Sequence, residues 1–313
     1  MARLVRYAWA VLFYNLAVIA WGAYVRATGS GAGCGAHWPL CNGEVLVRPQ
    51  TLEMLIEFSH RATSGLALIA VVVLFFWARR LTPPGHPLRL GANLSLGFML
   101  SEAALGAGLV LFQLVANDAS AARAFAVAAH LLNTFLLLAA LTLSVFWASG
   151  GAALAPSASR QARNRLLLGA GALLLVSVAG AVTALGDTLF PSGTLAEGLS
   201  ADLSTTSHFL IRLRTIHPIL AVMVALYLMT SVWQIANGAA RPKSLARLLT
   251  WLLVAQLVAG AANVLLLAPV WLQLLHLLLA DAVWVAYVFL GAEVLAVVPH
   301  LAHVVPDALP QRA

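Results

Sequence analysis

Charged residues are scarce in this sequence. Only 9% of its 313 residues are Asp, Glu, Lys or Arg, against about 25% in an average soluble domain. Hydrophobic residues make up 62% of the chain, and its mean hydropathy is +0.92. This composition excludes a soluble globular protein and predicts an integral membrane protein.

Acidic residues and cysteines are few as well. The chain has 11 Asp and Glu together and two cysteines, Cys34 and Cys41. A zinc site needs three or four converging ligands, often from an H-E-x-x-H motif, which the sequence lacks. A di-iron bundle needs several inward carboxylates, whereas only Glu102 and Asp281 lie deep in apolar segments. Both kinds of metal site are therefore disfavoured.

Eight apolar runs are long enough to cross a membrane. A hydrocarbon core of about 30 Å takes about 20 helical residues. We therefore expect an all-α integral membrane protein with eight transmembrane helices. The runs lie at roughly 7–25, 61–78, 92–115, 121–147, 165–185, 209–235, 246–268 and 270–297.

The basic residues follow the alternation of these runs. They concentrate at both termini and in the even-numbered loops, whereas acidic residues concentrate in the other loops. The positive-inside rule then predicts cytoplasmic termini in a bacterial-type plasma membrane. The formal charge of +7 reflects this topology and indicates no nucleic-acid partner. The residues are Arg3, Arg6, Arg79, Arg80, Arg89, Arg160, Arg163, Arg165, Arg241, Lys243, Arg247 and Arg312.

The two halves of the chain resemble each other. Residues 25–30 (VRATGS) resemble 182–187 (VTALGD), and residues 102–107 (EAALGA) resemble 256–261 (QLVAGA). An even number of helices in each half keeps the two copies in the same orientation, as in a parallel repeat. We expect two pseudo-symmetric four-helix bundles, over residues 1–150 and 151–313.

Four histidines occupy the outer turns of the second, fourth, sixth and eighth runs: His60, His130, His217 and His276. The repeat matches His60 with His217 and His130 with His276. An ionisable side chain within a bilayer costs free energy unless it lines a cavity or has a partner. A single such histidine is more often an interfacial hydrogen-bonding residue. Four histidines at a similar depth favour the interpretation that they are ligands. Two pairs on packed helices are typical of axial ligands to iron porphyrins.

Arginines on the outer side are exceptions to the charge rule. Arg26, Arg61, Arg212 and Arg214 lie near the outer ends of the histidine-bearing bundle. A guanidinium matches a carboxylate in bidentate geometry, and porphyrin propionates are carboxylates. Snorkelling to lipid headgroups is the alternative for each arginine.

The first outer loop contains both cysteines within a glycine-rich stretch, residues 29–43. The loop faces the oxidising side of the membrane, so a Cys34–Cys41 disulfide is expected. Such a bridge could either staple a loop that covers the bundle or act as a redox-active pair.

Several motifs carry a family resemblance. Residues 22–34 (GAYVRATGSGAGC), 38–43 (WPLCNG) and 57–61 (EFSHR) resemble the signature of haem A synthases, and 212–218 (RLRTIHP) fits the second half. The similarity covers essentially the whole chain. It implies an enzyme that converts haem O to haem A for terminal oxidases, by successive hydroxylation of the C8 methyl to a formyl group.

The resemblance also implies a role for each candidate residue. Substrate haem O would bind between His60 and His130, and a resident haem b between His217 and His276. Six-coordinate iron of this kind suits electron transfer better than dioxygen activation. Haem O synthase, which farnesylates haem, would be a partner, and a quinone is one possible electron acceptor. The remaining implied roles are catalysis by Glu57 with His60, contacts of Arg26 and Arg61 to haem O, and contacts of Arg212 and Arg214 to haem b.

The sequence departs from the family pattern in two places. Residues 186–208 lack the second cysteine pair of many relatives, and Glu102 stands where relatives commonly have glutamine, as at Gln256. A dihaem electron-transfer subunit of the cytochrome b kind is the alternative function. A transporter is a third reading, disfavoured because the histidines lie near one face instead of the midplane.

Overall fold

The computed structural model describes residues 1–45, 47–155, 159–236 and 240–296. Eight of its helices are long and apolar enough to cross a membrane, so the predicted all-α multi-pass membrane fold is confirmed. The end of the predicted second half, including Arg312, lies outside the described residues.

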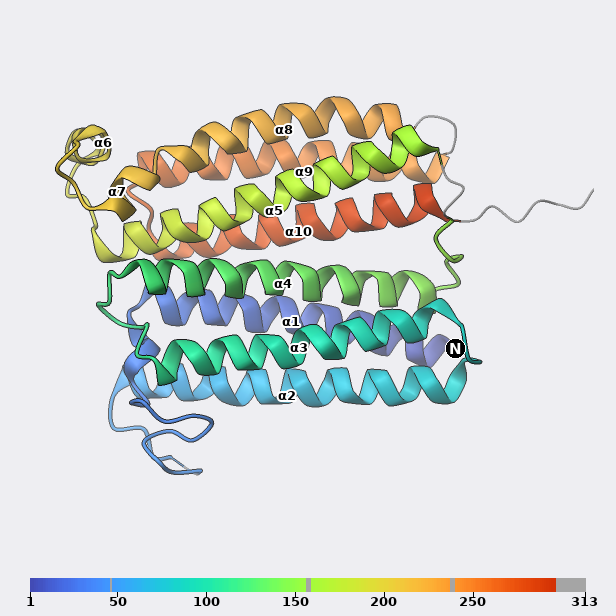
Figure 1. The fold of residues 1–313 in the computed structure, drawn as a ribbon, viewed down its shortest axis with the longest axis horizontal. Coiled ribbons are helices and arrows are strands. Elements are labelled where there is room, and N and C mark those ends of the chain that lie inside the picture. Colours follow the sequence, from blue (N-terminus) through green and yellow to red (C-terminus); the bar gives the residue numbers. More distant parts are fainter. Residues whose placement is uncertain (46, 156–158, 237–239, 297–313) are drawn as a thin grey trace, which may run out of the picture.

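The helices form two groups of four (Figure 1). In the first group each helix contacts the next, and the first and last also touch; the second group closes in the same way. The first group is α1 (Ala2–Ala27), α2 (Leu52–Leu81), α3 (Pro87–Leu111) and α4 (Ala121–Ala148). The second group is α5 (Arg160–Leu189), α8 (Ile216–Ile235), α9 (Ala240–Leu265) and α10 (Val270–Leu295). The short elements η1 (Ser30–Ala32), α6 (Leu195–Leu203) and α7 (Phe209–Leu213) lie in the connections, and α7 with α8 makes the sixth span.

Hydroxyl caps fix where several helices begin. The side chains of Thr51, Ser120 and Ser159 accept hydrogen bonds from backbone N–H groups in the first turns of α2, α4 and α5. These bonds satisfy donors that have no partner within the helix. The cap at Thr51 starts α2 at Leu52, well before the apolar run predicted from residue 61. The polar segment with Glu57 and His60 is therefore helical.

Helix α4 lies at the centre of the molecule. It contacts α1 and α3 of its own group and α5 and α10 of the other, and most residues from Phe135 to Ala148 are buried. The indole of Trp284 on α10 donates to the carbonyl of Phe135 at 2.7 Å. The two groups therefore share one apolar core, while the pseudo-symmetry between them and the boundary near residue 150 stay predictions.

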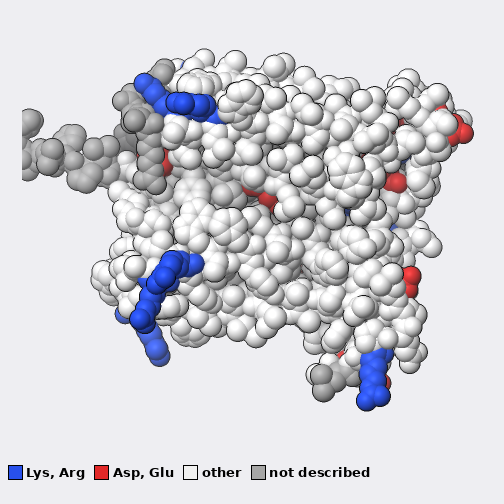
Figure 2. Space-filling model, turned by 180° about the vertical axis from the view of Figure 1, so that it is seen from behind, with Lys and Arg blue, Asp and Glu red and all other residues white. Residues whose placement is uncertain are grey.

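The two ends of the bundle differ in charge. The disulfide loop, α6 and α7 lie at one end, and the N-terminus lies at the other (Figure 1). On the face seen in Figure 2, most Lys and Arg side chains gather at the N-terminal end, whereas most of the acidic side chains lie toward the loop end. This distribution matches the charge pattern of the sequence. Which end faces the cytoplasm stays a prediction.

Candidate functional site

The four candidate histidines lie on helices that begin at the same end of the bundle. His60 is on α2, His130 on α4, His217 on α8 and His276 on α10. Each of these helices begins at the end of the bundle where the disulfide loop lies. Each histidine is within the first ten residues of its helix, or about 15 Å of axial rise. The first two belong to the first group of helices and the last two to the second.

In the second group the two imidazoles lie close together, with the edge of one ring toward the other. The ring centroids of His217 and His276 are 6.3 Å apart and the ring planes are perpendicular. A ring nitrogen binds a metal at about 2.0–2.1 Å, so two rings on opposite sides of one ion have centroids about 6 Å apart. The spacing therefore suits two axial ligands of one iron.

A break in the sixth span places His217. Helix α7 ends at Leu213 and α8 begins at Ile216, with Pro218 in the first turn of α8. Proline has no N–H to continue the ladder to the carbonyl four residues earlier. The Nδ1 atom of His217 lies 3.1 Å from the carbonyl oxygen of Val176 on α5, a contact that fixes the ring and leaves Nε2 for a ligand.

Each histidine ring packs against a glycine on the preceding helix of its group. A Cβ atom on Gly22 would lie 2.8 Å from Cε1 of His60, and one on Gly180 would lie 2.9 Å from Cε1 of His217. The corresponding separations are 3.1 Å for Gly260 and His276, and 3.8 Å for Gly106 and His130. Real Cβ atoms essentially never approach within 3.0 Å. Gly22 and Gly180 therefore leave the space that the rings of His60 and His217 occupy.

Ring nitrogens at three of these positions lack hydrogen-bond partners. Nδ1 of His60, His130 and His276 is buried, and no atom of the described residues meets it with hydrogen-bond geometry. Buried polar groups are nearly always hydrogen-bonded, so these three rings differ from ordinary core histidines. Together with the spacing of the His217 and His276 rings, the buried imidazoles fit a pair of sites that each take a metal-centred ligand.

Glu57 connects the site to the disulfide loop. Cys34 and Cys41 form the predicted disulfide, and both are buried. The backbone N–H of Cys34 donates to Oε2 of Glu57 at 2.7 Å. Arg61 pairs with Oε1 of the same carboxylate at 2.5 Å. One turn from His60, Glu57 therefore ties α2 to the loop.

The arginines have protein partners that the sequence did not reveal. Arg61 also donates to the carbonyls of His37 and Leu40 in the loop. Arg214 is buried and pairs with Asp202 at 2.8 Å and Asp187 at 3.2 Å, whereas Arg212 is exposed. Their predicted contacts to propionates stay predictions.

Arg26 crosses between the two groups of helices. Its guanidinium donates to the carbonyl of Ala184 at 2.6 Å, to Oγ1 of Thr188 at 2.7 Å and to Oε1 of Gln273 at 2.9 Å. These acceptors lie on α5 and α10, in the second group. The sequence placed Arg26 with the first-half site; its hydrogen bonds instead reach the second half.

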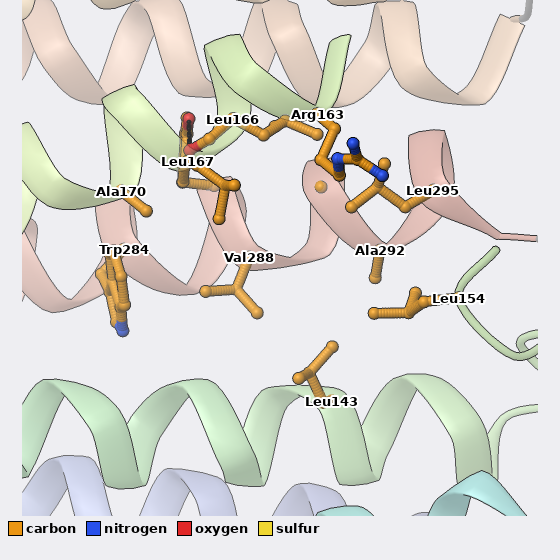
Figure 3. Close-up of a pocket in the computed structure, with 12 residues that line it drawn as sticks. Leu143, Leu154, Arg163, Leu166, Leu167, Ala170, Trp284, Val288, Ala292 and Leu295 are labelled. Atoms are coloured by element: carbon orange, nitrogen blue, oxygen red, sulfur yellow. Dashed lines mark hydrogen bonds between the residues drawn. The ribbon is translucent and has the colours of Figure 1, made fainter. Parts of the chain in front are cut away.

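Two further features lie away from the histidines. Asp281 on α10 is fully buried, and neither carboxyl oxygen has a hydrogen-bond partner within the described part of the chain. A pocket of about 170 Å³ lies between α4, α5 and α10, lined by apolar side chains such as Leu143, Val288 and Leu295, with Arg163 at one edge (Figure 3). Its lining contains none of the four candidate histidines.

Comparison with known proteins gives a family and a relative for most of the chain, and further relatives for parts of it. Residues 5–288 match a family described as cytochrome oxidase assembly protein. A Thermus thermophilus protein named protoheme IX farnesyltransferase is 53% identical over 296 residues, 94% of this chain and 49% of the relative. The chain thus spans about half the length of that relative.

Relatives with another name match over shorter regions. A heme A synthase of Halalkalibacterium halodurans is 40% identical over 124 residues, which cover 40% of this chain and 41% of the relative. A heme A synthase of Geobacillus kaustophilus is 42% identical over 97 residues, 31% of each.

Proposed function

The chain belongs to the family of cytochrome oxidase assembly proteins that its residues 5–288 match, and from this premise we propose that it is a haem A synthase. It oxidises the C8 methyl of haem O to the formyl group of haem A. The observation that carries the proposal is the pair His217 and His276, whose ring centroids are 6.3 Å apart. The sequence repeat matches these two histidines with His60 and His130. The names of the shorter matches support the same reaction.

The farnesyltransferase name of the Thermus relative does not argue against this function. The match covers 49% of that protein, so its other half can carry the named activity. Proteins hold a diphosphate leaving group through Mg²⁺ bound to carboxylates. Glu57 and Asp281 are buried carboxylates of this chain. They lie on different helices and Glu57 already pairs with Arg61, which disfavours a magnesium site formed by the two. The name of this relative makes the enzyme of haem farnesylation a suitable partner for substrate delivery.

The proposal assigns the two sites as follows. His60 and His130 hold the substrate haem O, and His217 and His276 hold a resident haem b. A haem b held by these two histidines would supply one-electron transfer. Arg212 lies five residues before His217, on α7, and is exposed, so it is free to reach a propionate. Because Arg26 donates to α5 and α10, we now place its predicted propionate contact at the boundary of the two sites.

Glu57 acts beside the substrate as a proton acceptor in this proposal. Its carboxylate oxygens accept hydrogen bonds from the Cys34 amide and from Arg61. Cys34 belongs to the disulfide loop, and Arg61 contacts that loop. The loop is therefore held against the start of α2, next to the proposed first-half site. We place the sites toward the outer face of the membrane and the N-terminus in the cytoplasm, as the charge distribution supports.

Pigment extraction tests the proposal directly. The chain is expressed in cells that make haem O and no haem A, and the haems of the membranes and of the purified protein are separated by chromatography. We expect haem A in the membranes, and haem B with haem O or haem A in the protein. Haem B alone, at two per chain, would support the dihaem cytochrome instead, and a protein without pigment would refute both.

Variants of the histidines separate the two sites. His60→Ala or His130→Ala should abolish haem A formation and leave the b-type spectrum largely intact. His217→Ala or His276→Ala should lose that spectrum. If His60→Ala continued to make haem A, the assignment of the substrate site to the first half would be wrong.

A further inference from the structure

Glu102 on α3 lies in a polar cluster inside the first group of helices. Asn133 donates to its Oε2 and Thr134 to its Oε1, both at 2.5 Å. Ser101 in turn donates to the Oδ1 atom of Asn133 at 2.6 Å. A carboxyl group in a membrane span is costly without such partners. These donors fix the position of the carboxyl group on the side of α3 that faces α4.

The carboxyl group faces one nitrogen of a proposed axial ligand. Oε1 of Glu102 is 3.5 Å from Nδ1 of His130, within ion-pair distance but outside hydrogen-bond geometry, and no hydrogen-bond partner of this nitrogen lies among the described residues. Thr134 also contacts the backbone carbonyl of His130. The ring is thus bounded by the carboxylate at Nδ1 and by Gly106 at Cε1. Nε2 is the nitrogen left for iron.

The equivalent contact in the second group is different. Gln256 takes the repeat position of Glu102, and its amide nitrogen lies 3.3 Å from Nε2 of His276. Nδ1 of His276 has no hydrogen-bond partner among the residues that the structure describes. An iron bound at Nε2 would displace this amide contact, whereas iron at Nε2 of His130 would leave the Glu102 contact in place. The two repeats therefore support their histidines unequally.

We propose that Glu102 is a positioning residue that accepts a hydrogen bond from Nδ1–H of His130 and thereby lowers the reduction potential of the first-half haem relative to the second-half haem. Groups behind a ligating histidine fix its tautomer and ring orientation and raise its basicity. A more basic ligand, and the negative charge behind it, stabilise the oxidised iron. The inference rests on the first-half haem site of the proposed function.

The potential difference gives the electrons a direction. Electrons released by oxidation of a first-half substrate would pass to a haem of higher potential, which His217 and His276 would hold. Gln256, as a neutral amide, adds no negative charge there. Glu102 in the first half and Gln256 in the second therefore distinguish two otherwise similar sites. The first-half site becomes the electron donor and the second-half site the acceptor.

Redox titration of the first-half haem tests the inference. The full chain with His217→Ala, which removes the second-half haem, is reconstituted with iron protoporphyrin IX and titrated by visible absorption. Glu102→Gln should raise the midpoint potential by at least a tenfold change in the one-electron equilibrium, about 59 mV. Glu102→Asp, which retains the charge, should raise it by less than half as much. Glu53→Gln, which removes an exposed carboxylate at the start of α2, should not change it.

The outcomes separate the inference from the proposed function. An unchanged potential in Glu102→Gln, or equal shifts for the Gln and Asp variants, would overturn the inference. So would failure of both variants to load haem, because Glu102 would then be needed only for assembly of the site. If the His217→Ala chain with native Glu102 binds no haem in the first half, the proposed function fails instead.

Discussion

At the scale of single residues, the site depends on small side chains as much as on its ligands. Four imidazoles each lie against a glycine of the neighbouring helix, and two of these contacts are too close for any Cβ atom. Gly22 belongs to a motif that the sequence made visible. Gly180 belongs to no such motif, because the repeat aligns it with Ala23 and not with Gly22. Only the packing of α5 against α8 reveals its role.

Gly180→Ala should displace His217. The added methyl would lie 2.9 Å from Cε1 of the ring, and the bond of His217 to Val176 limits how far the ring can turn. We expect at least a tenfold weaker affinity for haem b, a loss comparable with removal of a group that orients a metal ligand. Titration of the purified protein with iron protoporphyrin IX measures it.

Gly171→Ala is the matched control on the same helix. A Cβ atom there would meet nothing within 4 Å, and alanine favours a helix over glycine by roughly 0.5–1 kcal/mol. The control should bind haem b with unchanged affinity. Equal affinities of the two variants would show that the close approach has no effect on the ligand.

At the scale of elements, apolar runs predicted all eight spans but not where the helices begin. Helix α2 starts at Leu52 because Thr51 caps it, and hydropathy did not find this start because Glu53, Glu57 and His60 interrupt the apolar residues before 61. The contact of Glu57 with Cys34 joins a helix to a loop whose path no periodicity describes. The pairing of Arg214 with Asp187 and Asp202 depends on the placement of α6, which carries no membrane-span signal, and on the break between α7 and α8. Local patterns predicted the helices, whereas the contacts between distant segments required the structure.

The disulfide loop should be needed for the first-half site and not for the second. In a Cys34→Ser, Cys41→Ser double variant the loop loses its bridge, and the Cys34 N–H that donates to Glu57 is no longer held. Loss of a native disulfide typically costs about 2–4 kcal/mol. We therefore expect a lower melting temperature and reduced haem A formation, with the b-type spectrum retained. Haem extraction and visible spectra measure both, and loss of the b-type spectrum would contradict the prediction.

At the scale of the whole molecule, charge and topology predict one orientation. The connection between α2 and α3 lies at the N-terminal end of the bundle, and the segment between α5 and α6 lies at the other end. Because basic residues concentrate at the N-terminal end, that end should be cytoplasmic.

Reporter fusions test this orientation. Alkaline phosphatase, which is active only outside the cytoplasm, should be inactive when fused after Pro84 and active when fused after Ser192. A cytoplasmic fluorescent reporter at the same positions should give the opposite pattern. The reverse result for both reporters would place the histidine sites at the inner face.

The hydrogen bonds of Arg26 to Ala184, Thr188 and Gln273 bear on how such a chain evolves. Two identical four-helix chains related by a twofold axis would present the same residue on both sides of their seam, whereas here the repeat position of Arg26 holds Thr183. Within one covalent chain, matched positions of the two halves can hold different residues. A protein assembled from two copies of either half would therefore not reproduce the contacts of Arg26 with α5 and α10.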